Sequence, residues 1–160
     1  MAILTLSGRA AMAIAIKAQP IHLAWGSGDT AWDAAPVVET VDQIELIAEV
    51  GRRAATSVKF CVPDEAGEII VPTGRFTEVT EPSNHLYMKF NFDFADSPSA
   101  EIREAGVFTG TQVIAGLPVG QTYFIPSEIQ APGILLALER FPKFSRSSAV
   151  RQSFEFVITI

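Results

Sequence analysis

The sequence predicts an α+β fold, with two N-terminal helices followed by a largely antiparallel β-sheet or sandwich. Two observations lead to this prediction. Residues 1–53 contain an alanine-rich segment and apolar residues at helical spacing, whereas apolar and polar residues alternate along several later segments. The length of 160 residues suits a single domain, 1–160. We divide it into a helical part, residues 1–53, and a β-rich part, residues 54–160.

The first predicted helix spans Gly8–Ala18. Ser7 is a suitable N-cap, the alanines favour helix, and Pro20 ends the segment. Apolar side chains lie nearly all around this helix, so we expect it to be buried or docked on a neighbouring protein.

The second predicted helix follows a short strand, Ile21–Trp25, and a turn-rich loop, Gly26–Pro36. Gly51 is a natural C-terminal cap for it, and Arg52 and Arg53 place positive charge where a helix end favours it. The helical spacing is carried by Val41, Ile44, Ile47, Ala48 and Val50.

The remaining residues predict strands. Thr56–Val62 and Glu68–Val71 flank residues 63–67, which read as a hairpin connection. His85–Phe94 alternates strictly between apolar and polar residues, so one face of this strand should lie in the core. Further strands are predicted at 101–108, 123–125, 134–144 and 154–160, with a short β segment near Val113.

Composition excludes several classes of protein. Hydrophobic residues make up 48% of the chain and charged residues 19%, and mean hydropathy is +0.27, which is too apolar for a disordered chain. The net charge of −6 repels phosphate and argues against a nucleic-acid partner. No apolar run approaches the roughly 20 residues of a membrane span, and the short run Ala10–Ile16 lacks a clear signal-peptide cleavage site. We therefore expect a soluble, unexported protein without a membrane or nucleic-acid partner.

No pattern of catalytic, cofactor-binding or metal-binding residues emerges. His22, His85 and Cys61 lack the clustered spacing of a metal site, and one cysteine cannot form an intrachain disulfide. Residues 26–29 lack the Gly-Lys-Ser/Thr of a phosphate loop. The acidic residues of 93–104 lack calcium-loop spacing. We predict no enzyme, cofactor or metal, although a distant pair of carboxylates for glycoside hydrolysis stays open.

Near the C-terminus, basic and aromatic residues are interleaved. This pattern can indicate nucleic-acid binding, but in an acidic chain we favour a strand with alternating faces or a rim that pairs with an acidic partner. The residues concerned are Arg140, Phe141, Lys143, Phe144, Arg146 and Arg151.

Three segments carry a family resemblance. Ile21–Asp29 ends in a Gly-x-Gly turn, Ile47–Arg53 contains Glu-Val-x-Arg, and Ile102–Phe108 reads Ile-Arg-Glu-Ala-Gly-Val-Phe. In this order, over roughly the first 115 residues, the chain resembles the N-terminal attachment region of bacteriophage tail-fibre and tail-collar proteins. Val107 stands where that family often has leucine, and Thr109-Gly110-Thr111 replaces its usual turn. Residues from Gly116 onward lie outside the resemblance.

The resemblance implies a structural component of a phage tail, at the baseplate or the tail-fibre attachment point, which acts by protein–protein docking during virion assembly. It implies other tail proteins as partners, a homo-oligomer in the virion, and synthesis in the host bacterial cytoplasm. We expect interface residues on the first helix, at the large aromatics and at the paired arginines. They are Met12, Ile16, Trp25, Trp32, Arg52 and Arg53. The alternative is a carbohydrate- or receptor-binding β-module at the tail tip, in which exposed aromatic rings stack on sugars.

Overall fold

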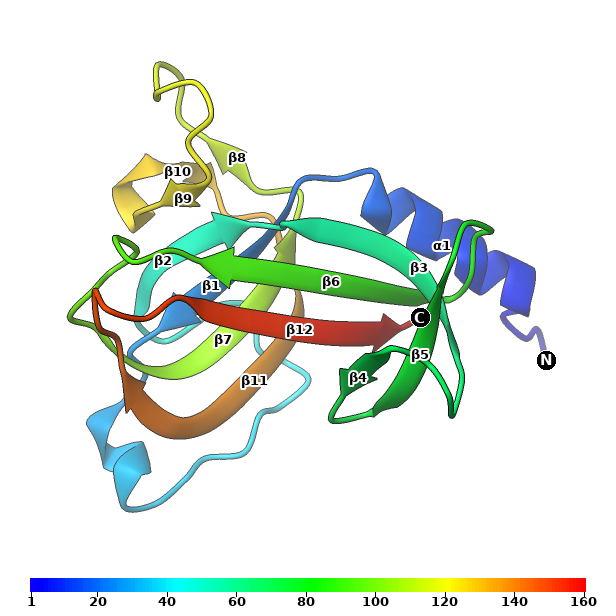
Figure 1. The fold of residues 1–160 in the computed structure, drawn as a ribbon, viewed down its shortest axis with the longest axis horizontal. Helices are drawn as coiled ribbons and strands as arrows, with labels where there is room; N and C mark the ends of the chain where they lie inside the picture. The colour runs from blue at the N-terminus through cyan, green and yellow to red at the C-terminus, as the bar shows by residue number, and fades with distance from the viewer. The chain divides into compact units, whose positions relative to one another are not determined.

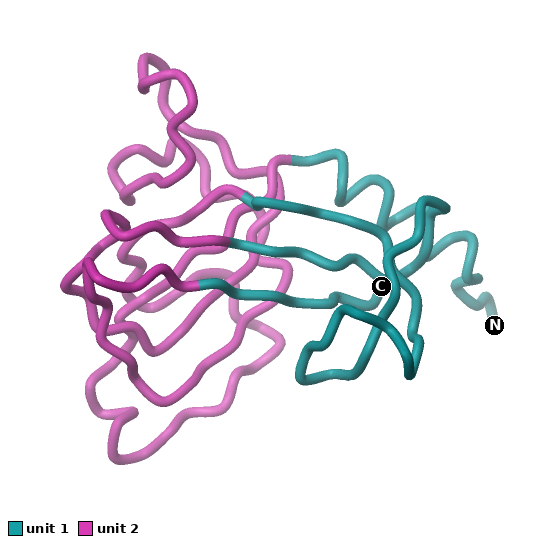
Figure 2. Tube along the Cα trace, viewed as in Figure 1, with its two compact units in different colours: residues 1–19, 55–90, 153–160 teal, residues 20–54, 91–152 magenta.

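The computed structural model describes residues 1–160, which form two compact units (Figure 2). Unit 1 comprises residues 1–19, 55–90 and 153–160, and unit 2 comprises residues 20–54 and 91–152. The structure is mainly β, with 45% of residues in strands and 12% in helices, so the predicted α+β class is wrong. It contains no helix with the length and apolar composition of a membrane span.

The first predicted helix is present in unit 1 as α1, Leu6–Lys17 (Figure 1). Its N-cap is Thr5 rather than Ser7, and the Thr5 hydroxyl accepts a hydrogen bond of 3.2 Å from the amide of Gly8. Ala13 is the buried residue of this helix. Most of its apolar side chains are therefore open to solvent.

The sheet of unit 1 has five strands in the order β12-β6-β3-β5-β4. Its central strand β3 pairs antiparallel with β5 on one side and with β6 on the other. The strands are β3 (Ser57–Pro63), β4 (Ile69–Val71), β5 (Gly74–Val79), β6 (His85–Phe92) and β12 (Gln152–Thr159). The alternation predicted for β6 is confirmed, because its burial follows period two along the whole strand.

The predicted hairpin at residues 63–67 is wrong. β4 pairs with β5, and the tight turn lies between Val71 and Gly74. Gly74 has a φ of +142°, a conformation that favours glycine, so the turn forms here. Residues 63–67 instead form a local turn in which Asp64 accepts a hydrogen bond from the amide of Ala66.

The main sheet of unit 2 has the order β11-β7-β1-β2-β9. β1 (Ile21–Gly26) is buried along its whole length between β2 (Glu49–Ala54) and β7 (Glu101–Thr109), and both pairings are antiparallel. β11 (Ile134–Ser145) borders β7, and β9 (Tyr123–Phe124) borders β2. A small sheet joins β8 (Gln112–Val113) to β10 (Ile129–Ala131), and two short 3-10 helices are η1 (Thr30–Asp33) and η2 (Pro126–Glu128).

The second predicted helix is wrong. Residues 41–48 form turns and irregular backbone, and the chain then enters β2. Val41, the first residue of the helical spacing, is fully exposed. Leu46, the buried residue of this stretch, does not belong to that spacing, so the spaced apolar residues cover no core. Gly51 lies within a strand, where a Cβ atom would collide with the Tyr123 ring, rather than at a helix end. Pairing with β1 and β9 thus overrides the local pattern.

Candidate functional site

The Ile102–Phe108 segment that carries the family resemblance forms most of β7, and its charged side chains point into unit 2. Arg103 donates two hydrogen bonds of 2.8 Å to the carboxylate of Asp33 and one of 3.0 Å to the carbonyl of Ser27. Because Arg103 bonds to it, the pKa of Asp33 is lowered to about 2. Arg103 therefore holds the loop after β1 against the sheet.

Glu104 holds the segment before β2 against the sheet. Its fully buried carboxylate accepts hydrogen bonds from the amides of Ile47 and Ala48, at 2.8 and 3.4 Å. Its other oxygen lies 3.9 Å from Nε of Arg140, which is an ion pair longer than a hydrogen bond. Two backbone amides of the irregular segment that replaces the predicted helix thus donate to a buried carboxylate.

Arg52, a predicted interface residue, is buried in unit 2. It forms two hydrogen bonds of 2.7 Å with Glu49, and others with the Thr111 hydroxyl and the Pro132 carbonyl. Its guanidinium also lies 4.2 Å from the ring centroid of Phe108. These contacts join β2 to the residue before β8, Thr111, and to the residue after β10, Pro132.

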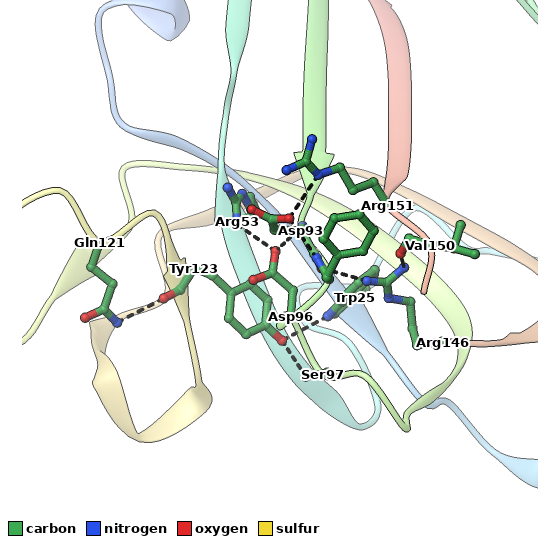
Figure 3. A network of polar contacts seen from close by, with 11 residues as sticks. Trp25, Arg53, Asp93, Asp96, Ser97, Gln121, Tyr123, Arg146, Val150 and Arg151 are labelled. Carbon is green, nitrogen blue, oxygen red and sulfur yellow. Dashed lines mark hydrogen bonds and ion pairs between the residues drawn. The ribbon is translucent and has the colours of Figure 1, made fainter. Parts of the chain in front are cut away.

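A polar network surrounds Trp25, another predicted interface residue (Figure 3). Trp25 is fully buried, stacks at 3.6 Å on Phe92, and donates a hydrogen bond of 3.1 Å to the Tyr123 hydroxyl. That hydroxyl also bonds to Ser97 at 2.6 Å, and the guanidinium of Arg146 lies 5.0 Å from the Trp25 ring. Trp25 is therefore a core residue of unit 2.

The same network pairs the acidic residues of the 93–96 loop with arginines (Figure 3). Arg53 and Asp96 form an ion pair of 2.7 Å, and Arg151 lies 3.0 Å from the carboxylate of Asp93. Arg146 donates to the carbonyl of Asp93 at 2.8 Å. Asp93 and Asp96 are thus each paired with an arginine.

A groove on unit 2 is the feature that sequence reasoning missed. It encloses about 540 Å³ between residues 36–39 and a distorted part of β11. The β11–β7 register shifts between Arg140 and Phe144, and Pro142, which cannot donate to the ladder, lies within that shift. A proline inside a predicted strand is the sequence feature that could have indicated it. The lining residues include Trp32, Val37, Val38, Arg140, Phe141 and Pro142.

The predicted interface residues have different environments. Trp25 and Arg52 are buried, and Arg53 is half-buried in its ion pair. Trp32 is half-exposed in the groove, with the Arg140 guanidinium 4.4 Å from its ring. Met12 and Ile16 lie on α1 in unit 1, the first exposed and the second half-buried.

Cys61 and His22 are buried side chains whose pKa values are shifted by their surroundings. Cys61 is buried, and burial raises the pKa of its thiol to about 11. His22 is buried in β1, and its Nδ1 has no hydrogen-bond partner. Burial, with a smaller effect of Arg52, lowers its pKa to about 4. No group of three or more His, Cys, Asp or Glu side chains has the arrangement of a metal site.

These features define a β-rich protein whose buried charges fix irregular loops and whose N-terminal segment exposes apolar side chains. The family model of the baseplate wedge 3 tail fiber network component matches residues 1–160, and the chain belongs to this family. The comparison with curated proteins finds no match. The predicted resemblance to phage baseplate and tail-fibre proteins is confirmed, and the chain is a phage tail component of the baseplate.

Proposed function

We propose that the chain is a non-enzymatic structural part that joins the baseplate by docking its N-terminal segment onto another tail protein. The observation that carries this proposal is the exposed apolar surface of residues 1–14. Leu6 is 74% exposed and Ile3 82% exposed, although both are large aliphatic residues. Leu4, Met12 and Ile14 are exposed as well. Large apolar side chains exposed together on one segment mark interaction sites.

Charge supports the choice of partner surface. The segment through the end of α1, residues 1–17, contains no Asp or Glu, and its basic residues are Arg9 and Lys17. The segment is therefore apolar and cationic in a chain of net charge −6. An apolar partner surface with an acidic rim fits it.

Substitution on α1 tests this proposal. Leu6→Asp combined with Met12→Asp should leave unfolding unchanged, because neither side chain is buried, and should abolish incorporation of the chain into phage particles. Mass spectrometry of purified particles measures incorporation. The matched control is Ile70→Asp on β4, an exposed apolar residue of the same unit, which should be incorporated normally. Normal incorporation of the α1 variant would contradict the proposal.

The alternative, a carbohydrate- or receptor-binding module, has less support. Trp25 is buried and offers no face for stacking on a sugar, and one face of the Trp32 ring is occupied by Arg140. We further propose that the chain forms a homo-oligomer in the virion and is made in the cytoplasm of the bacterial host.

A further inference from the structure

The groove of unit 2 contains one acidic side chain that no cation neutralises. Glu39 lines the groove, and one of its carboxylate oxygens accepts a hydrogen bond from the backbone amide of Arg140. Glu39 forms no ion pair, and its second oxygen accepts no hydrogen bond. Residues 18–51 contain no Lys or Arg, so the segment around Glu39 has no cation of its own. Burial, and to a smaller extent the charge on Glu39, raises the pKa of the neighbouring Glu139.

The basic side chains of the groove, in contrast, already have acidic partners. The ion pairs are those of Arg103 and Lys143 with Asp33 and Glu101, and that of Arg140 with Glu104. Nε of Arg140 has no hydrogen-bond partner, but it is buried 3.9 Å from the Glu104 carboxylate. An anionic ligand that approached Arg140 would therefore also meet the like charge of Glu104. The charge that the groove leaves uncompensated is the negative charge of Glu39.

The walls beside Glu39 are apolar and open to solvent. Val37 is 49% exposed and Val38 76% exposed, and Phe141 of β11 lies across the groove from them. The loop that carries both valines runs along β11 at the periphery of unit 2 (Figure 1). Lys and Arg side chains combine an aliphatic stem, which packs on apolar walls, with a cationic end. Such a side chain matches both the walls and the free carboxylate.

We infer that the groove binds a Lys or Arg side chain of another baseplate protein, carried on a segment with apolar neighbours. The stem of this side chain lies between Val38 and Phe141, its charged end pairs with Glu39, and the apolar neighbours cover Val37. A neutral segment would cover Glu39 without pairing it, and an acidic segment would add a like charge beside Glu39 and Glu139. Charge thus selects a basic occupant. The inference goes beyond the docking of α1 and does not rest on it.

Three synthetic peptides test this selection on the full-length chain. They share the sequence Ala-Leu-X-Leu-Ala, are blocked at both ends, and carry arginine, norleucine or glutamate at X. NMR titration follows the indole N–H of Trp32 and the backbone amides of Val38 and Phe141. We expect the arginine peptide to shift these signals saturably and to bind about fivefold more tightly than the norleucine peptide. The glutamate peptide should bind more weakly than either.

Glu39→Gln isolates the contribution of the charge. The side-chain oxygen of glutamine can still accept a hydrogen bond from the backbone amide of Arg140, so the groove should keep its shape. The arginine peptide should then bind no more tightly than the norleucine peptide, whose own affinity should not fall. The matched control is Glu45→Gln, which neutralises an exposed carboxylate outside the groove and should preserve the preference for arginine.

Several results would overturn the inference. They are the absence of a saturable shift with the arginine peptide, equal binding of the arginine and norleucine peptides, tighter binding of the glutamate peptide, and a preference for arginine that survives Glu39→Gln. The Leu6→Asp, Met12→Asp variant should keep this preference, because α1 belongs to unit 1 and the groove to unit 2. Failure of α1 docking and failure of this inference are therefore distinguishable.

Discussion

The sheets of the two units place their charges differently. In unit 1, Lys59 pairs with Glu78 across neighbouring strands, and both side chains are more than two-fifths exposed. In unit 2, Arg52 and Glu104 are buried and bind backbone or side-chain groups of distant segments. Unit 1 therefore depends on alternating apolar residues, whereas unit 2 uses buried charges to fix its loops. A charge contributes to the fold mainly where it is desolvated and fully partnered.

Removing a buried charge from unit 2 should have the largest effect. Arg52→Ala leaves Glu49 without its partner and removes one of the two donors to the Pro132 carbonyl, the other being the Thr111 hydroxyl. We expect the free energy of unfolding to fall by about 4 kcal/mol, the cost of breaking one side of a buried ion pair. Urea denaturation followed by circular dichroism measures it. A loss similar to that of an exposed charge would show that burial of Arg52 does not stabilise unit 2.

Glu104→Ala should follow, with a loss of about 3 kcal/mol, because two backbone amides lose their acceptor. Hydrogen exchange gives a local readout: the amides of Ile47 and Ala48 should exchange faster in this variant. Glu104→Gln keeps a carbonyl oxygen and should retain much of their protection. Unchanged exchange in Glu104→Ala would contradict the role assigned to this carboxylate.

Acid should destabilise unit 2 through His22. Its folded pKa of about 4 lies below the ordinary value of 6.5, so the unfolded chain binds the proton more readily. His22 therefore contributes stability that is complete above pH 6.5 and is lost as the pH falls towards 4. From about pH 7 to about pH 5, we expect its contribution to fall by about 2 kcal/mol. His22→Gln should flatten this part of the pH profile, and an equally steep profile in that variant would contradict the assignment.

The smallest effect is expected in unit 1. Lys59→Ala removes an exposed ion pair, so the free energy of unfolding should change by less than about 1 kcal/mol. The same denaturation experiment measures it, and added salt should reduce the difference further. A loss as large as that of Arg52→Ala would remove the contrast between the two units.

The sequence predicts those elements whose own residues determine them. α1 follows from its alanines and from the proline beyond its end, and β6 follows from strict alternation. The Ile102–Phe108 segment carries the family resemblance in its sequence. The sequence does not show why this segment contains charged residues. Arg103 and Glu104 are buried because their partners, Asp33 and Ile47, come from distant parts of the chain.

The errors have the same cause. The helical spacing of residues 41–50 meets no core, and the second half of the predicted helix pairs with β1 instead. The residues at 63–67 suit a hairpin, but β5 occupies the place beside β3. Trp25 looked like an interface residue because large aromatics are common in interfaces, yet it stacks on Phe92 in the core. Long-range pairing decided each case.

A reconstruction of the phage baseplate that resolves side chains tests the central claim most directly. The claim is that the exposed apolar residues of the N-terminal segment are a docking surface. We predict that Leu6 and Met12 of α1 lie covered by apolar side chains of another tail protein. A baseplate in which the chain is present while both side chains face water would contradict the claim.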